Sequence, residues 1–261
     1  MKNNIIKASI LKEFYMKKLT LSLITLLSIN AYAGGDIIPP IVVPVVPVVP
    51  VIVPVDTVDY ALGLKIGTLG VGLDLSVPIN NQFNVRLNLN GASYSDNSTE
   101  DGIDYEYDLD LLTAGVLLDY YPMEGSEFRV TGGVYYNGTE LEMCGKPDAT
   151  TGITIGNINY NATQIGSLNA KVEFDEIAPY VGIGWGNSVK KGGWSFSADV
   201  GLMYQGEPEV TLTPIYGPAI TNASLQAPID AEVVREEAEL QDTLNDYKIY
   251  PVISVGITYT F

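Results

Sequence analysis

The sequence predicts an all-β fold, an eight-stranded antiparallel transmembrane up-and-down β-barrel with a short helix in its last long loop. Three observations predict this fold. Eight segments alternate apolar residues with polar or small ones, which is the period-two pattern of a strand with one apolar face. Short and long connections alternate between these segments, and aromatic residues gather near the ends of their apolar faces. Both features are typical of barrels that cross a lipid bilayer.

The clearest alternation lies in 83–90, where every odd-numbered residue is apolar or aromatic and every even-numbered residue is Asn or Arg. Hydrocarbon cannot hydrogen-bond a free sheet edge, so strands of this kind must close into a barrel. We assign residues 58–261 to that barrel. Its eight segments are 60–66, 71–77, 83–90, 112–120, 128–136, 177–185, 194–204 and 247–261.

The connections separate a membrane barrel from a soluble sandwich, which has no reason to alternate their lengths. In outer-membrane barrels, short turns lie on the periplasmic side and long loops lie outside. After the tight turn at 67–70, the short connections here are 78–82, 122–127 and 187–193, and the long ones are 93–105, 137–175 and 205–246. We expect the three long connections to be surface loops.

Residues 1–33 contain a secretory signal peptide. Met16 is followed by two lysines, an apolar run and the small-residue cleavage site Ala31–Ala33, the order typical of such a peptide. We take Met16 as the true start; the apolar run is too short for the alternative, a membrane anchor. Residues 34–57 carry six prolines among apolar residues, which predicts an extended periplasmic linker. The alternative for this linker is binding to a periplasmic partner.

The last strand reads YKIYPVISVGITYTF. It resembles the C-terminal targeting strand of Gram-negative outer-membrane barrels, with Gly256, Ile257, Tyr259 and Phe261 in the places of the assembly signal. The alternative is an ordinary final strand of a soluble sandwich.

Over residues 58–261, the chain resembles the small eight-stranded family that includes the outer membrane protein A barrel, the opacity-type proteins and outer membrane protein W. The resemblance implies a monomer of the cell envelope that is placed in the outer membrane by the barrel-assembly machinery. It also implies contact with outer-membrane lipid and lipopolysaccharide.

Seven charged residues belong to the inward-facing sets of the strands. An eight-stranded barrel is just wide enough for side chains to fill, so charges there must be paired. The pattern predicts a charge network that plugs the lumen; the alternative is a narrow, porin-like pore or a transporter for small or hydrophobic molecules. The seven are Lys65, Asp74, Arg86, Asp119, Arg129, Asp199 and Lys248.

Composition excludes several classes of function. The net charge of −17 disfavours phosphate contacts with nucleic acid. The chain has no His, which excludes a Ser-His-Asp triad and His-based metal sites, and its lone Cys144 excludes an internal disulfide. We expect no enzyme activity, no cofactor and no metal, with a carboxylate-based outer-membrane enzyme as a remote alternative. The acidic run 96–110 could bind Ca²⁺, although a solvated loop is the simpler interpretation.

Residues 230–246 show apolar residues at helical spacing, including Val233, Leu240 and Leu244, with Asp230 as the expected N-cap. We expect this helix to cap the barrel mouth; the alternative is a partner-binding surface. Together these features predict an outer-membrane barrel with a structural or surface-interaction role, toward an extracellular or periplasmic partner that the sequence does not identify.

Overall fold

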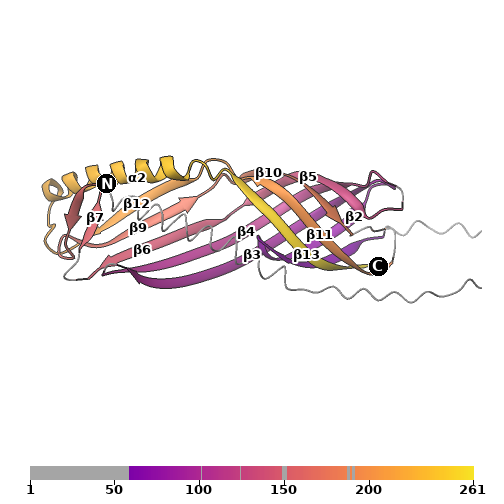
Figure 1. Ribbon diagram of the computed structural model, residues 1–261, viewed down its shortest axis with the longest axis horizontal. Coiled ribbons are helices and arrows are strands. Elements are labelled where there is room, and N and C mark those ends of the chain that lie inside the picture. The colour runs from indigo at the N-terminus through magenta and orange to yellow at the C-terminus, as the bar shows by residue number, and fades with distance from the viewer. Residues whose placement is uncertain (1–58, 101, 124, 149–151, 187–188, 190–191) are drawn as a thin grey trace, which may run out of the picture.

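The computed structural model describes residues 59–261, except 101, 124, 149–151, 187–188 and 190–191. The predicted signal peptide, Met16 and the predicted linker therefore lie outside the described residues. The described part is all-β apart from one helix. It is elongated, with a ring of strands at one end and a sheet covered by the helix at the other (Figure 1).

The ring closes through eight antiparallel strands. Consecutive strands of the ring pair side by side, and β13 pairs with β1 from Ala61↔Thr260 to Gly67↔Ser254, which completes the circle. Each of the eight predicted segments lies in one of these strands or extends beyond it by at most two residues, because each segment alternates with the period that a two-faced strand requires. The strands, in ring order, are β1 (Ala61–Gly67), β2 (Gly70–Pro78), β3 (Phe83–Glu100), β4 (Ile103–Tyr120), β5 (Phe128–Asn137), β10 (Ile177–Trp185), β11 (Gly193–Tyr204) and β13 (Ile249–Thr260).

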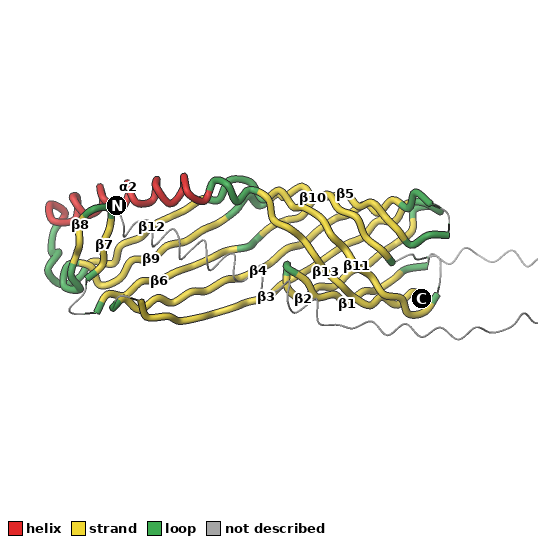
Figure 2. Tube along the Cα trace, in the orientation of Figure 1, coloured by secondary structure: helices red, strands yellow, loops and turns green. Residues whose placement is uncertain are grey.

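The long connections are not loops, so that expectation is wrong. β3 and β4 continue beyond the ring, and the sheet continues from them in the order β4, β6, β9, β12 (Figure 2). β4 pairs with β5 over 113–120 and with β6 over 103–110, so one strand belongs to both parts. The strands outside the ring are β6 (Glu140–Pro147), β7 (Ile153–Ile155), β8 (Ile158–Tyr160), β9 (Ile165–Glu173) and β12 (Glu209–Tyr216).

We call this part the extension: β6 to β9, β12, the helix, and the segments of β3 and β4 at 92–110. In this part, β4 and β12 alternate between buried and exposed residues, whereas β3 is exposed at nearly every position from 92 to 100. Tyr105 and Tyr107 are buried, while the carboxylates beside them face outward. The acidic residues of 96–110 that the structure describes therefore lie on a paired hairpin and not in a loop.

Helix α2 (Ala223–Leu244) covers the extension and begins earlier than predicted. Its N-cap is Asn222, whose side chain accepts from the backbone N–H groups of Ser224 and Leu225, and Asp230 lies inside the helix. Pro228 is the sixth residue of the helix, past the first four amides, which lack helical partners, so it removes one helical hydrogen bond, the one to the carbonyl oxygen of Ser224. Among the described residues, no helix is long and apolar enough to cross a membrane.

The inner face of the extension packs against α2 in one apolar core. Ile229, Val233 and Leu240 of the helix lie within it, together with the inward residues of β4, β6, β9 and β12. The helix thus lies along the extension, as Figure 1 shows, instead of capping the mouth of the ring. This core gives the extension its own apolar interior, separate from that of the ring.

The ring is apolar outside and polar inside over much of its height. Leu64, Ile183 and Phe196 are typical of its outer face, with exposures of 50%, 52% and 81%. Two neighbouring glycines of β5 show the difference between the inner and outer faces of the ring. A Cβ on the inward Gly133 would come within 2.4 Å of the carbonyl oxygen of Val116, whereas a Cβ on Gly132 would meet nothing within 4 Å. The strand faces therefore follow the predicted register.

Candidate functional site

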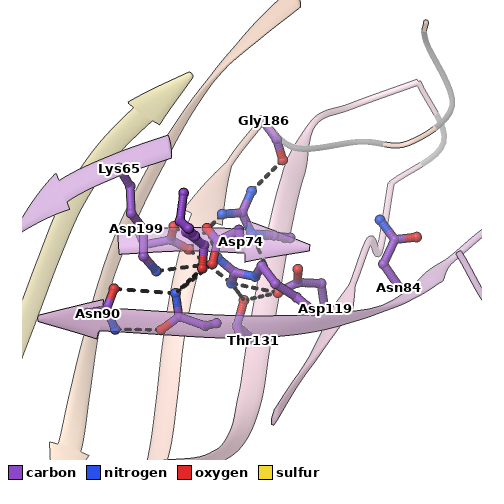
Figure 3. Close-up of polar contacts among 12 residues, drawn as sticks. Lys65, Asp74, Asn84, Asn90, Asp119, Thr131, Gly186 and Asp199 are labelled. Atoms are coloured by element: carbon purple, nitrogen blue, oxygen red, sulfur yellow. Dashed lines mark hydrogen bonds and ion pairs between the residues drawn. The ribbon is translucent and has the colours of Figure 1, made fainter. Parts of the chain in front are cut away.

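Six charged side chains meet inside the ring, and Figure 3 labels four of them, Lys65, Asp74, Asp119 and Asp199. Each sits at an inward position of an alternating strand, which is why residues far apart in the sequence converge there. All six are at most 7% exposed. They are Lys65 on β1, Asp74 on β2, Arg86 on β3, Asp119 on β4, Arg129 on β5 and Asp199 on β11.

Arg86 lies at the centre of this network and contacts three carboxylates. Its Nη2 lies 2.9 Å from Oδ1 of Asp119, and its Nη1 lies 3.2 Å from Oδ2 of Asp199. The same Nη1 lies 3.6 Å from Oδ2 of Asp74. Its guanidinium thus links β3 to β2, β4 and β11 across the lumen, and a planar fork with several donors suits that task better than an ammonium would.

Arg129 completes the opposite side of the network. Its Nη2 donates to Oδ1 of Asp199 at 2.7 Å, and its Nη1 donates to the carbonyl oxygen of Gly186. Asp119 also accepts from the hydroxyl of Thr131 at 2.6 Å. Figure 3 shows Thr131 and Asp119 side by side beneath this cluster, with the Gly186 carbonyl at its rim.

The charges balance within the network. Lys65 pairs with Asp74 at 3.3 Å, so three cationic and three anionic side chains share one buried volume. Isolated burial of any of them would carry a large desolvation cost, which the mutual pairing offsets. The sequence pattern had placed these six on inward faces, and the structure adds which partner each one meets.

A ladder of amides extends the network along the lumen. Asn88 donates to Oδ1 of Asp74 at 2.7 Å, and Asn90 donates both to Asn88 at 2.6 Å and to the hydroxyl of Thr113 at 2.8 Å. These amides are not among the residues that the charge pattern predicts for the network. Their even-numbered positions in 83–90 were the available signal, because they share the inward face with Arg86.

Large apolar and aromatic side chains share the lumen with the charges and amides. Tyr135 and Tyr180 meet edge to face with ring centroids 5.5 Å apart, and Tyr135 is 1% exposed. Tyr250 donates to the carbonyl oxygen of Thr68 at 2.7 Å, so its hydroxyl is satisfied near the turn between β1 and β2. The other buried members of this cluster are Leu69, Leu117, Ala178, Met203 and Val252.

Lys248 does not belong to the network, so its assignment to the lumen is wrong. It precedes β13 by one residue and pairs with Glu207 outside the ring, with its side chain 35% exposed. The hydrogen bond from Lys248 to Glu207 raises the pKa of the lysine. The apolar alternation of the sequence runs back to Tyr247, whereas β13 begins at Ile249, so Lys248 lies before the strand.

The residues of the predicted assembly signal lie at the end of the ring away from the extension (Figure 1). Phe261 stacks on Tyr60 with centroids 4.8 Å apart and meets Tyr259 edge to face at the same separation. Tyr259 in turn meets Trp194 at 5.1 Å. Ile257 is exposed on the outer face, and Gly256 leaves space for Lys65, whose Cβ would lie 2.9 Å from an added methyl. Their role in assembly stays a prediction.

The acidic hairpin of the extension uses its carboxylates for cross-strand hydrogen bonds. Asp108 accepts from the hydroxyl of Ser95 at 2.5 Å, Asp104 accepts from Thr99 at 2.7 Å, and Asp110 accepts from Ser93. In the part of the chain that the structure describes, no group of three or more His, Cys, Asp or Glu residues is arranged to hold a metal ion.

Comparison with solved structures bears on the fold. CarO2 of Acinetobacter baumannii superposes with a TM-score of 0.52 at 22% identity, over 78% of this chain and 99% of that chain. This chain shares its fold. CarO of the same organism gives a TM-score of 0.46 at 24% identity, over 77% and 97% of the two chains. A major outer membrane protein from Thermus thermophilus gives 0.42 at 11%, over 78% and 100%.

No protein-family model matches the sequence, and no curated protein matches it. The fold shared with CarO2 agrees with the predicted barrel fold. It does not show the narrower resemblance to outer membrane protein A, the opacity-type proteins or outer membrane protein W.

Proposed function

We propose that this chain is an outer-membrane barrel with a structural or surface-interaction role, whose lumen is closed by its own side chains. The observation that carries the proposal is that the ring is apolar on its outer face and filled with side chains on its inner face. Its outside is a continuous apolar surface, while its inside is filled by Arg86, Arg129 and the apolar cluster around Tyr135. A surface of this kind is stable in hydrocarbon and costly in water.

Aromatic side chains at one end of the ring support the membrane location. Besides the group around Phe261, Phe83 stacks on Tyr120 with centroids 4.9 Å apart, and Trp185 pairs with Phe128 in the same end of the sheet. Such residues form the girdle of a membrane barrel at the level of the lipid head groups. Outer-membrane lipid and lipopolysaccharide would be the surroundings of this surface, and the barrel-assembly machinery would place it there.

The orientation follows from the two ends of the ring. The C-terminal end and the short turn between β2 and β3 lie at one end, and the extension lies at the other (Figure 2). Outer-membrane barrels place short turns in the periplasm and long excursions outside the cell. The extension would therefore project from the cell surface, where its covered sheet offers a surface to partners. Neither a catalytic role nor a cofactor is part of this proposal.

The native thiol tests this orientation, because Cys144 is the chain's one cysteine and lies on β6 of the extension. We expect a membrane-impermeant maleimide to label Cys144 on intact cells. The matched control is Asn81→Cys in a Cys144→Ser background, which places a thiol in the exposed turn between β2 and β3. That thiol should react only after the outer membrane is opened.

The opposite pattern, with Asn81→Cys labelled on intact cells and Cys144 protected, would reverse the orientation. Equal labelling of both thiols before and after lysis would contradict insertion in the outer membrane. Each variant is first checked for a folded barrel by its heat-modifiable electrophoretic mobility, so a loss of folding is not mistaken for protection.

A further inference from the structure

In the part of the chain that the structure describes, the sheet of the extension has two edge strands, and only one of them has its backbone groups covered by the helix. At one edge, α2 covers β12 with two side chains. Gln241 accepts from the backbone N–H of Val210 at 3.0 Å, and Glu237 accepts from that of Leu212 at 2.9 Å. These contacts satisfy backbone donors that would otherwise be open to another strand, which is a usual way to protect a sheet edge.

The other edge is β3 beyond the ring. β2 pairs with β3 only as far as Val71↔Gly91, and β3 then continues to Glu100 with β4 as its neighbour. Within the described residues, no strand pairs with the other side of β3 over 92–100. The β3–β4 register runs through this segment without a shift, so the edge is regular.

Hydrogen-bond alternation shows which backbone groups this edge presents. Tyr121 N–H donates to the carbonyl oxygen of Gln82 at 2.8 Å, which makes the neighbouring Phe83↔Tyr120 a non-hydrogen-bonded pair. Even-numbered residues of β3 therefore bond to β4, and odd-numbered ones direct their N–H and C=O groups to the other side. Beyond Gly91 those odd-numbered residues are Ser93, Ser95, Asn97 and Thr99, and all four are exposed.

The side chains around this edge favour cations. The hydroxyls of Ser93, Ser95 and Thr99 are short, and each donates to a carboxylate of β4 one strand behind. A strand docked on β3 would lie about 10 Å from β4, two strand spacings away. Long Lys or Arg side chains on it could pass over the short hydroxyls toward Asp104, Asp108 and Asp110. In contrast, Lys146 already neutralises Glu106 at 2.7 Å.

We propose that β3 between Ser93 and Thr99 is a docking edge for an extended basic polypeptide, which would add a strand to the extension. Main-chain hydrogen bonds would hold the partner, and alternate Lys or Arg side chains would select it. The inference gives the surface-interaction role a partner class, and only the location of the edge outside the cell rests on the proposed function. The edge is partly guarded, because Asp96 accepts from the N–H of Asn97 at 3.0 Å. Docking would therefore centre on Ser93 and Ser95.

A second copy of the chain fits this edge poorly. Two β3 edges would bring two sets of the same carboxylates together, with no Lys or Arg in 92–110 to compensate. Like charges across paired strands are destabilising. Charge complementarity thus favours a basic strand over self-association.

The test uses the folded, full-length protein in detergent micelles and a labelled peptide that alternates Lys and Val. We expect the fluorescence anisotropy of the peptide to rise when it binds the protein. We also expect the backbone amides of Ser93 and Ser95 to become protected from hydrogen exchange. The control peptide is methylated on every second backbone nitrogen, at the positions that would face β3. It should bind at least about tenfold more weakly, because these nitrogens cannot donate hydrogen bonds to the carbonyl oxygens of β3. A peptide with Glu in place of Lys should not bind.

The protein offers a matched pair of variants at the same position. Ser95→Pro removes an outward N–H without removing a bond to β4, and proline is tolerated at strand edges of this kind. It should weaken binding at least about tenfold, whereas Ser95→Ala, which keeps the N–H, should bind nearly as wild type. Asp108→Asn should also weaken binding and reduce its dependence on salt.

Three outcomes would overturn the proposal. Equal binding of the methylated and unmethylated peptides would show charge attraction without strand addition. Absence of binding at about millimolar peptide would remove the docking edge. Protection of Ser93 and Ser95 that grows with protein concentration, without peptide, would assign the edge to a second copy. All are read on purified protein, so they stay distinct from the thiol labelling that tests location.

Discussion

Arg86→Met is expected to be among the most destabilising single substitutions in the ring. The guanidinium is 1% exposed and holds Asp74, Asp119 and Asp199, so its removal leaves an excess of buried negative charge. Breaking a buried pair by removing one partner costs about 3–5 kcal/mol. We expect a loss of this size in the free energy of unfolding, measured by urea titration in micelles with heat-modifiable mobility as the readout.

The double variant Arg86→Met, Asp119→Leu restores the balance of charges. It should therefore cost less than the sum of the two single variants, with a coupling of about 1–3 kcal/mol. Lys171→Met is the matched control, because Lys171 pairs with Glu140 and Glu173 on the surface at 36% exposure. Its loss should cost under about 1 kcal/mol. Additive costs for Arg86 and Asp119 would mean that water, and not ion pairing, satisfies these groups.

Leu87→Arg is expected to destabilise the protein by about 2–4 kcal/mol in lipid, because it places a charge at the middle of the apolar surface. Leu87 lies halfway along the ring part of β3, opposite Leu75 on β2 and Val116 on β4, and is 47% exposed. In water, an exposed leucine replaced by arginine would cost little. The measurement is the free energy of unfolding in phospholipid bilayers.

Leu225→Arg is the control for this substitution. Leu225 lies on α2 of the extension and is 43% exposed, so the two leucines differ chiefly in what surrounds them. We expect the helix variant to stay within about 0.5 kcal/mol of wild type. Similar small costs at both positions would place the outer face of the ring in water and remove the basis for a membrane barrel.

The ring could be predicted from sequence because each of its strands has one apolar face, toward the outside, and one polar or small-residue face, toward the lumen. A period of two is unambiguous when apolar and polar residues alternate as they do around Arg86, and it fixes which side chains point inward. The six charged residues of the network were found in this way. Their pairing was not, because it depends on the shear between strands, which alternation does not encode.

The extension was missed for a physical reason. Its segment of β4 alternates too, but the outward positions there carry Asp and Glu, including Asp104 and Asp108, and such an acidic run is typical of a solvated loop. Hydroxyl partners on β3 accommodate those carboxylates in a sheet. The first part of α2 contains Pro228, a residue that usually interrupts a helical pattern. Lys248 fits the inward set of the last strand by alternation, but it and Tyr247 lie between the turn at Asn245 and Asp246 and the start of β13 at Ile249.

Ion conductance tests the central claim, a membrane barrel closed by its own side chains, most directly. The purified protein is reconstituted into a planar bilayer, with insertion verified by protease protection in matched vesicles and a general-diffusion porin as the positive control. With Arg86, Arg129 and Tyr135 filling the lumen, the inserted protein is expected to show no sustained channels. Sustained open channels of uniform conductance would contradict the closed lumen and would make a narrow pore the better account.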